Sequence, residues 1–470
     1  MQEKYRVLFE PGRIAGVPLK NRFYMAPIGP SGMCDAEGAF TETAVEYYAV
    51  RARGGVGLII TGDCFVENEI QPCVMPSHVV PTLRPTCFIR SAKRLTERVH
   101  AYGTKIFIQL SAGFGRVGHA SNVSGDVIAP SPVEHRWIKG LMCREMTVEE
   151  IHTFVRKFGE AAAHAKKAGF DGVLIHGGPG FLFTPFLSPL MNTRTYSYGG
   201  SLENRARFPL QILKAVREAV GPDFLVELRI DGTDHQPGGI TPEETGAFVA
   251  MAEPYITSVH VTCGIYEASV KSGTESSMFH PHGLNIDNAA IIKKYTKLPV
   301  GAVGGINSPE LCEQAIAEGK IDFAILGRQM LADPEFASKA KRGHADQLRR
   351  CLRCYKCFPG SPEEGYDDLP FTSEELALYV GHCTINPLAH LPFDPDTLAP
   401  ASKQETVLIV GGGAAGMQAA ITACDRGQKV ILAEQGPRLG GLLRFTDVDT
   451  DKPDLMNFKN LLVREVERRD

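Results

Sequence analysis

Four cysteines in the last third of the chain are spaced to bind a metal centre. Cys351, Cys354 and Cys357 are separated from one another by two residues, and Cys383 follows after 25 more, in the sequence Cys-Thr-Ile-Asn-Pro. Four thiolates in such a tight arrangement bind either a zinc ion or a 4Fe–4S cluster. The spacing alone leaves both kinds of metal centre open.

A glycine-rich turn follows soon after the cysteines. The apolar run 406–410 predicts a strand, the residues after it match Gly-x-Gly-x-x-Gly, and a helical pattern comes next. Glycines there let backbone amides approach a pyrophosphate at the start of a helix, and an acid at the end of the next strand suits a ribose hydroxyl. The pattern therefore predicts a dinucleotide site. Its residues are Gly411, Gly413, Ala415, Gly416 and Glu434. The stretch Gly436-x-x-Leu439-Gly440-Gly441 resembles FAD-binding domains, and this resemblance favours FAD over NAD.

Glycines also end two short apolar runs earlier in the chain. Gly304 and Gly305 end the run 299–306, and Gly327 stands before Arg328 at the end of the run 323–328. Such glycines serve tight turns in many proteins, but they also let backbone amides approach a phosphate, with which an arginine can pair. Occurring together at the ends of two consecutive strands, they favour a phosphate-bearing cofactor.

Other polar or special residues stand at strand ends nearer the N-terminus. Ala26 and Pro27 end the first apolar run, Gln109 lies in the third, and Arg229 is near the end of the fifth. An arginine and a glutamine in these positions are either buried structural groups or partners of a flavin's pyrimidine edge, where positive charge stabilises the reduced ring.

The elements that must position these residues are eight apolar runs that alternate with amphipathic stretches. Their near-continuous Val, Ile and Leu content is typical of parallel strands covered by helices. Helical patterns at 41–53, 147–168, 242–252 and 308–318 separate some of them. The count of eight favours a (β/α)8 TIM barrel over a doubly wound sheet. The runs are 23–28, 56–63, 105–111, 172–178, 224–231, 258–264, 299–306 and 323–328.

We therefore expect an α/β protein in three parts. Residues 1–345 form the barrel, residues 346–402 form an irregular connector that carries the cysteines, and residues 403–470 begin a Rossmann-like dinucleotide-binding domain. This last part has only two predicted strands, 406–410 and 429–434, which is too few for a mononucleotide-binding half. Either the chain is a fragment of a longer protein or this last segment packs on the barrel. We expect the domain to be incomplete and favour the fragment.

Composition excludes several classes of partner. The chain has 470 residues, a net charge of -4 and no block of like charge, which argues against a nucleic acid or an anionic membrane as partner. No signal-like N-terminus and no run of eighteen apolar residues is present, so we expect no membrane span and a cytoplasmic location. The other eight of the twelve cysteines are scattered singly and are expected to be free thiols. The oligomeric state is left open.

These features together resemble the Old Yellow Enzyme superfamily of NADH:flavin oxidoreductases. The resemblance covers residues 5–340 and rests on Leu-Lys-Asn-Arg at 19–22, Met-Ala-Pro at 25–27, Gln109, and a long specific stretch at 186–205. It implies an FMN-binding barrel. The FMN ligands that it implies are Ala26, Pro27, Gly62, Gln109, Arg229, Gly304, Gly305, Gly327 and Arg328.

The cysteines between a flavin barrel and a dinucleotide motif resemble the subgroup that includes 2,4-dienoyl-CoA reductase and trimethylamine dehydrogenase. This implies a 4Fe–4S cluster on Cys351, Cys354, Cys357 and Cys383, with electrons passing from NAD(P)H through FAD and the cluster to FMN. The gap before the fourth cysteine is longer than is usual in the subgroup, so residues 358–382 are interpreted as a loop insertion.

The catalytic residues depart from the family pattern. The family has His, then Asn or His, then Tyr at the end of the fourth strand, where this chain has His176, Pro179 and Phe181. The resemblance implies that His176 holds a substrate carbonyl oxygen, but phenylalanine cannot donate the proton that the tyrosine often supplies. Tyr266 stands where 2,4-dienoyl-CoA reductase has a histidine. Our hypothesis is that Tyr266 is the acid; the alternative is that it lines the pocket and water protonates.

The expected function is NAD(P)H-dependent reduction of a C=C bond conjugated to a carbonyl, in an enone, an enoate or a dienoyl-CoA. Small residues after the third strand (Ala112, Gly113 and Gly115) leave space for a bulky or flat substrate, such as a steroid or bile-acid enone or an aryl acrylate. One alternative is an amine dehydrogenase, which needs an aromatic cage for a cationic substrate. The chain has a single tryptophan, Trp137, which argues against this alternative. Another is a non-catalytic electron-transfer flavoprotein.

Overall fold

Eight parallel strands form a closed barrel. The computed structural model describes residues 3–29, 32–72, 78–118, 127–136, 138–266, 276–357, 381–389 and 399–469. Each barrel strand pairs with the next along the chain, and the last pairs with the first, which confirms the predicted TIM barrel. The strands are β3 (Phe23–Met25), β4 (Leu58–Phe65), β5 (Lys105–Ser111), β8 (Gly172–Gly177), β9 (Leu225–Asp231), β10 (Ser258–Thr262), β11 (Val300–Ala302) and β12 (Phe323–Leu326).

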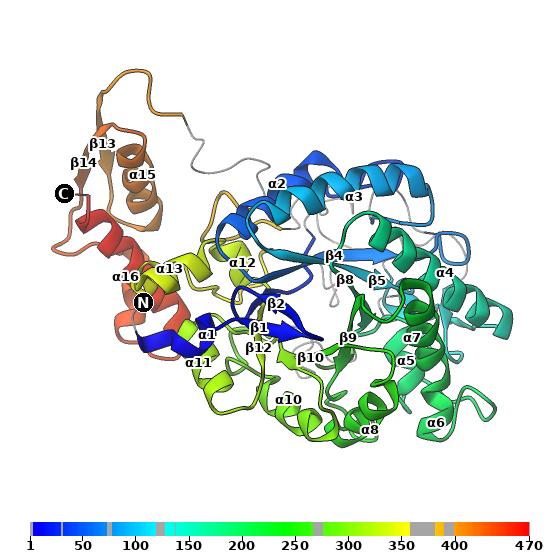
Figure 1. The fold of residues 1–470 in the computed structure, drawn as a ribbon. Coiled ribbons are helices and arrows are strands. Elements are labelled where there is room, and N and C mark those ends of the chain that lie inside the picture. The colour runs from blue at the N-terminus through cyan, green and yellow to red at the C-terminus, as the bar shows by residue number, and fades with distance from the viewer. Residues whose placement is uncertain are drawn as a thin grey trace.

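Helices surround the barrel (Figure 1). The four helical patterns correspond to four of them, and α4 begins with the predicted capping box, in which Thr147 and Glu150 bond each other's backbone amides. The longer helices are α2 (Glu42–Arg53), α3 (Pro85–His100), α4 (Val148–Lys167), α7 (Arg207–Val220), α8 (Pro242–Ala252), α10 (Ile286–Ile292), α11 (Pro309–Ala317) and α13 (Phe336–Arg342). Shorter ones are α1 (Arg6–Phe9), α5 (Phe183–Leu187), α6 (Leu202–Arg205) and α12 (Gln329–Ala332).

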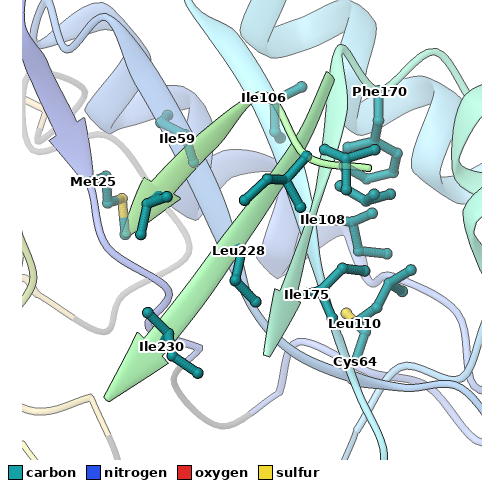
Figure 2. Close-up of a cluster of buried hydrophobic side chains, with 14 of the residues drawn as sticks. Met25, Ile59, Cys64, Ile106, Ile108, Leu110, Phe170, Ile175, Leu228 and Ile230 are labelled. Atoms are coloured by element: carbon teal, nitrogen blue, oxygen red, sulfur yellow. The ribbon is translucent and has the colours of Figure 1, made fainter. Parts of the chain in front are cut away.

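Alternation along the strands divides the apolar residues into two layers. One set, which includes Met25, Ile59, Ile108 and Leu228, belongs to the large buried cluster that also contains the helices' apolar residues (Figure 2). The residues between them along the strands form a second cluster inside the barrel: Tyr24, Ala26, Leu58, Ile60, Phe107, Leu174, Leu225, Phe323 and Ile325. This parity assigns each polar strand residue to the interior or to the helix-covered face.

Two small sheets were not predicted. β1 (Gly12–Ile14) and β2 (Val17–Leu19) form an antiparallel hairpin, and β6 (Ile128–Ala129) pairs with β7 (Arg144–Glu145). Segments of two or three residues are too short to show a periodicity. Ile14 and Leu19 of the hairpin belong to the inner cluster of the barrel, so the hairpin packs against the barrel interior.

The C-terminal part contains β13 (Thr406–Val410), α15 (Ala414–Asp425), β14 (Lys429–Ala433), a 3-10 helix (Gly441–Asp447) and α16 (Pro453–Glu467). The two predicted strands are present as β13 and β14 and pair in parallel. Helix α15 begins at Ala414, three residues after Gly411, which has a φ of 102° and starts a turn. One face of the two-stranded sheet is open: Leu408 is 63% and Val410 is 82% exposed.

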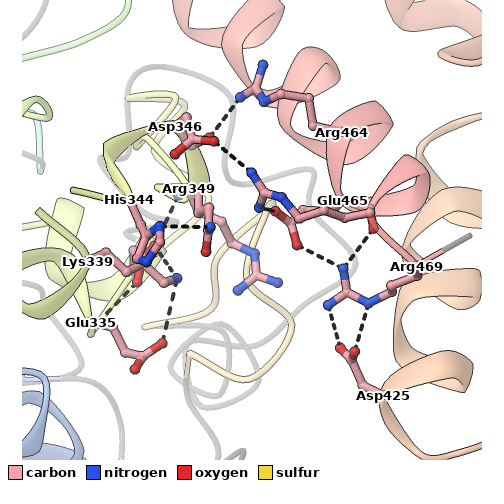
Figure 3. A network of polar contacts seen from close by, with 12 residues as sticks. Glu335, Lys339, His344, Asp346, Arg349, Asp425, Arg464, Glu465 and Arg469 are labelled. Carbon is pink, nitrogen blue, oxygen red and sulfur yellow. Dashed lines mark hydrogen bonds and ion pairs between the residues drawn. The ribbon is translucent and has the colours of Figure 1, made fainter. Parts of the chain in front are cut away.

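Helix α16 connects this part to the barrel. Arg464 donates to the backbone carbonyl of Asp346 at 2.8 Å, and Arg468 donates to the Asp346 carboxylate at 2.6 Å (Figure 3). Arg469 pairs with Asp425 of α15 at 2.8 Å. The helix therefore contacts both its own domain and the segment that follows α13. Among the described residues, none of the helices combines the length and the apolar character that a membrane crossing requires.

Candidate flavin and cysteine sites

Three polar side chains meet at the C-terminal end of the barrel. Gln109 and Arg229 share the parity of Phe107 and Leu225, so they point into the barrel. Arg229 Nη1 donates to Gln109 Oε1 at 3.1 Å, and Gln109 Nε2 donates to Asp63 Oδ1 at 3.1 Å. Burial raises the pKa of Asp63 to about 7, although the Arg229 charge and the Gln109 hydrogen bond oppose this rise.

Asp63 was not singled out from the sequence. A register shift in β4 between Ile60 and Asp63 brings this residue opposite Gln109 of β5. Strand alternation counted from Ile60 gives a different parity, so the sequence pattern alone does not place Asp63 in the site. Its position as the last residue of the predicted strand 56–63 was the one available signal.

His176 lies beside Arg229 on the neighbouring strand, where the two residues are register partners. Burial and the Arg229 charge hold the pKa of His176 well below 6.5, so the imidazole is neutral at pH 7. Its ring meets that of Phe181 edge-on, with centroids 4.4 Å apart. Within the described part of the chain the buried Nδ1 atom has no hydrogen-bond partner, as expected of a group that meets a bound molecule.

Tyr266 lies on the other side of the loop that follows β8. A Cβ atom built on Gly180 would be 2.7 Å from Cδ2 of Tyr266, so this ring packs directly on the glycine next to Phe181. The backbone carbonyl of Tyr266 accepts a hydrogen bond from Arg136 Nε. Tyr266 and His176 thus approach the same short loop from β10 and β8. Trp137 lies outside the described residues.

The predicted phosphate residues follow β11 and β12. Gly304 and Gly305 have φ values of 146° and 63°, so both adopt conformations that favour glycine. Because β11 ends at Ala302, the glycine pair lies in a turn beyond the strand, not within the predicted run 299–306. Arg328 donates to the backbone carbonyl of Ser276, and its guanidinium lies 5.1 Å from the ring centre of Tyr355.

The remaining predicted FMN residues lie at the neighbouring strand ends. Ala26 donates its backbone N–H to Leu326 at 2.9 Å, and a Cβ built on Gly327 would be 3.6 Å from the Ala26 Cβ. Pro27 follows directly. Gly62 of β4 donates to Tyr48 Oη at 2.7 Å, and a Cβ there would lie 2.6 Å from the Gly29 Cα, so the close approach of β4 to the segment after β3 requires this glycine.

The four cysteines line one pocket. Arg328, Tyr355 and Thr384 are among the other residues around it. The backbone N–H of Arg353 donates to Cys351 Sγ at 3.4 Å, and Thr384 Oγ1 lies 3.2 Å from Cys354 Sγ. Burial raises the pKa of Cys351 to about 11 and that of Cys357 to about 12.

The side-chain types of this pocket fit an iron–sulfur cluster, but in the positions that the structure describes they do not form a metal site. In the described ranges, no three His, Cys, Asp or Glu side chains are arranged to hold a metal ion. Four thiols spread around one pocket, with an N–H donor to sulfur and a nearby guanidinium, match the thiolate ligation and sulfur hydrogen bonding of clusters. Most of the interpreted insertion, residues 358–380, lies outside the described residues.

The glycine-rich turn of the C-terminal part is closed by Glu434. Its two carboxylate oxygens accept from the backbone of Gly412 at 2.6 Å and of Gly436 at 2.8 Å, and these bonds lower its pKa. A Cβ on Gly416 would collide with the carbonyl oxygen of Gly411, so the helix approaches the strand too closely for any other residue. Gly413 caps α15 and Ala415 lies in its first turn, next to the predicted pyrophosphate position.

Comparison with known proteins gives two family matches. Residues 7–347 match the NADH:flavin oxidoreductase / NADH oxidase family, and residues 406–462 match the family of FAD dependent oxidoreductases. A cinnamate reductase from Clostridium sporogenes is 40% identical over 94% of this chain and 66% of its own length. The chain therefore spans just under two thirds of that relative.

Two solved structures resemble the whole chain. A 2-naphthoyl-CoA reductase in complex with 2-naphthoyl-CoA is 28% identical, with a TM-score of 0.86 over 99% of this chain and 70% of that one. A histamine dehydrogenase from Rhizobium sp. 4-9 is 26% identical, with a TM-score of 0.84 over 99% of this chain and 65% of that one. These matches confirm the family resemblance that the sequence motifs indicated.

Proposed function

Because the chain belongs to the NADH:flavin oxidoreductase / NADH oxidase family, we propose that it is the greater part of an NAD(P)H-dependent ene-reductase. Its substrate is a C=C bond conjugated to a carbonyl. The observation that carries this proposal is the strand-end group of His176, Arg229 and Gln109, in which a neutral imidazole lies beside a guanidinium at the barrel mouth. The 40% identity to a cinnamate reductase supports it.

The cofactors are assigned to the sites described above. FMN would be held by the strand ends around Gln109, Arg229 and Arg328, FAD by the turn at 411–416, and a 4Fe–4S cluster by the four cysteines. When bound, FMN supplies the hydride, while FAD and the cluster carry electrons from NAD(P)H to it. Arg328 contributes to both the expected phosphate site and the cysteine pocket, so the two centres are neighbours.

His176 is proposed to orient the substrate. A neutral imidazole keeps one N–H, and that donor can bond the carbonyl oxygen on which negative charge grows during reduction. A protonated histidine would be costly here, because the site already contains the Arg229 charge and is buried. The residue therefore polarises the carbonyl without titrating near neutral pH.

Tyr266 is proposed to donate the proton to the α-carbon. Its ring packs beside the loop that carries Phe181, the residue that replaces the usual family tyrosine. A phenol carries an O–H proton that it can donate, so it can act as a general acid. Phe181 has no acidic proton to donate. Its ring packs roughly perpendicular to the His176 ring.

Among conjugated substrates, a flat aromatic enoate is the best supported. The similar proteins include a cinnamate reductase and a 2-naphthoyl-CoA reductase in complex with 2-naphthoyl-CoA. Both are named after compounds with an aromatic acyl group. The likeness to a histamine dehydrogenase keeps amine oxidation as a competing outcome of the test.

The test uses the anaerobically purified 470-residue chain. FMN, FAD, iron and sulfide are measured first; the protein is then reduced with dithionite and mixed in a stopped-flow instrument with cinnamate, an enone or a dienoyl-CoA. We expect rapid reoxidation of the flavin by at least one of them. In a parallel experiment the oxidised protein is mixed with histamine or dimethylamine. Flavin reduction by an amine, with no reoxidation by any conjugated substrate, would contradict the proposal.

A further inference from the structure

One carboxylate at the start of α16 is surrounded by partners from three distant segments. Asp454 is 7% exposed, and its Oδ1 accepts from Asn307 Nδ2 at 2.9 Å and lies 3.1 Å from His282 Nε2. Its Oδ2 accepts from Arg353 at 3.2 Å. Burial alone would raise the pKa of Asp454, but these partners lower it below its ordinary value, so the carboxylate is ionised.

Two of these partners contact the turn after β11. His282 Nδ1 lies 2.6 Å from the backbone carbonyl of Gly305. The His282 ring therefore bridges the Asp454 carboxylate and the Gly305 carbonyl. A Cβ built on Gly305 would be 3.2 Å from Cδ of Arg353, so the arginine side chain also packs against the turn. Asp454 thus faces the Arg353 guanidinium and the His282 ring, which both contact the turn at Gly305.

The same partners reach the cysteine segment. Asn307 Nδ2 also donates to the backbone carbonyl of Cys351 at 3.2 Å, and Arg353 stands between Cys351 and Cys354 in the sequence. Arg353 Nη1 donates to the carbonyl of His280 at 2.5 Å. A single side chain of the C-terminal part therefore connects the β11 turn with the cysteine pocket.

We propose that Asp454 is a positioning residue that couples docking of the C-terminal part to FMN binding in the barrel. This rests on the proposed function, in which the turn at Gly304 and Gly305 holds the FMN phosphate. With Asp454 in place, Arg353 and His282 are both held against the turn and keep it in its phosphate-binding conformation. Without it, the buried Arg353 guanidinium loses its anion, His282 loses its partner on α16, and the turn loses its anchor. By linkage, FMN binding in turn stabilises the docked α16.

The opposing explanation is that Asp454 only attaches α16 to the barrel. The chain offers a matched control, because Arg468 also attaches α16 but does so at Asp346, an exposed contact at the other end of the helix. If docking alone mattered, Arg468→Gln and Asp454→Asn would have similar effects. If Asp454 positions the turn, only Asp454→Asn weakens FMN binding.

The experiment measures FMN release from the full chain. Wild type, Asp454→Asn and Arg468→Gln are diluted as holoproteins, and the FMN dissociation constant is obtained from recovered flavin fluorescence. We expect a dissociation constant about tenfold higher for Asp454→Asn, within the usual range of coupling between sites. For Arg468→Gln we expect a change of less than about twofold, as for exposed ion pairs. Iron content and melting temperature are recorded for each protein.

A second measurement covers the case in which Asp454→Asn folds poorly. His282→Asn removes one contact to the turn and one to Asp454 while leaving every residue of α16 in place, and it should weaken FMN binding in the same direction. Hydrogen exchange of the peptide 301–307 should increase in both variants and not in Arg468→Gln. Equal FMN affinity in wild type and Asp454→Asn, with exchange unchanged, would overturn the inference; a wild-type chain that binds no FMN would overturn the proposed function as well.

Discussion

Arg229 on β9 donates a hydrogen bond to the side-chain oxygen of Gln109 on β5, although 120 positions separate them in the sequence. The strand between them in the barrel is β8, which carries His176. Barrel closure therefore produces a continuous polar edge across three strands, and this edge is where the flavin's pyrimidine ring is expected to bind.

Two substitutions of Arg229 distinguish the effect of its charge from the effect of its hydrogen bonds. In Arg229→Met we expect the midpoint potential of bound FMN to fall, because the cation that stabilises the reduced ring is lost. Arg229→Lys should keep most of the potential but bind FMN more weakly, since an ammonium cannot reproduce the guanidinium fork. Reductive titration and FMN content check both variants. Identical potentials in Arg229→Met and wild type would contradict a flavin contact.

Glu227 makes the stability of the barrel depend on pH. This side chain points inward with Arg229, accepts from Ser258 Oγ at 3.2 Å, and has its pKa raised by burial to about 8 from 4.5. Between these values the folded chain keeps a proton that the unfolded chain releases. Stability should therefore fall as pH rises from about 5 to about 8, by up to about 1.4 kcal/mol per pH unit.

Glu227→Gln should remove this contribution, so its stability relative to wild type should increase with pH over the same interval. Urea unfolding at three pH values between about 5 and about 8 tests this. Glu218→Gln, at an exposed position, is the control and should follow wild type. The same pH slope in Glu227→Gln and wild type would show that Glu227 is ionised in the folded chain.

Tyr266→Phe tests the proton donor. If Tyr266 is the acid, turnover of a conjugated substrate should fall by about 10²- to 10⁴-fold, while reduction of the flavin stays unchanged. Tyr295→Phe, which alters a half-exposed tyrosine, is the matched control. Wild-type turnover in Tyr266→Phe would instead indicate that water donates the proton.

Phe181→Tyr in the Tyr266→Phe background provides a rescue experiment. It restores a phenol at the family position, on a ring whose centre is 4.4 Å from that of His176. We expect part of the lost activity to return, with a solvent isotope effect on the substrate step. No recovery, despite wild-type flavin content, would mean that Phe181 does not face the substrate's α-carbon.

We expect the four thiols of the cysteine pocket to contribute equally to binding the cluster. Wild type should contain about four iron and four sulfide per chain, and Cys351→Ser or Cys383→Ser should lose both. Cys424→Ser changes a cysteine of α15 that does not line the pocket and should retain them. Zinc without sulfide in the wild type would overturn the cluster assignment, and full iron content in Cys383→Ser would exclude the fourth ligand.

Gly416→Ala should abolish FAD binding. The added methyl would collide with the Gly411 carbonyl, which forces α15 away from β13. Gly436→Ala is the matched control, because its methyl would meet Glu434 only at 3.4 Å. Both FAD content and FMN content are measured. The barrel should keep its FMN in both variants, so that loss of FAD alone locates the effect in the C-terminal part. Normal FAD content in Gly416→Ala would contradict the assigned motif.

Much of this protein could be predicted from local sequence. The eight strands, the capping box at Thr147, the turn at Gly411–Gly416 and the four spaced cysteines follow from periodicity and from motifs whose members are close in the chain. Strand ends were also located well enough to identify Gln109, His176 and Arg229, because the active end of a parallel barrel is set by strand direction.

Only the tertiary structure decided which of these residues meet and which others join them. Asp63 reaches Gln109 because β4 shifts register, and Asp454 reaches the β11 turn because α16 docks on the barrel. Neither event leaves a local pattern, since a register shift and a docking contact depend on atoms more than forty residues away. The sequence by itself determined the barrel, the motifs and the family; barrel closure and docking determined the hydrogen-bonded groups that connect them.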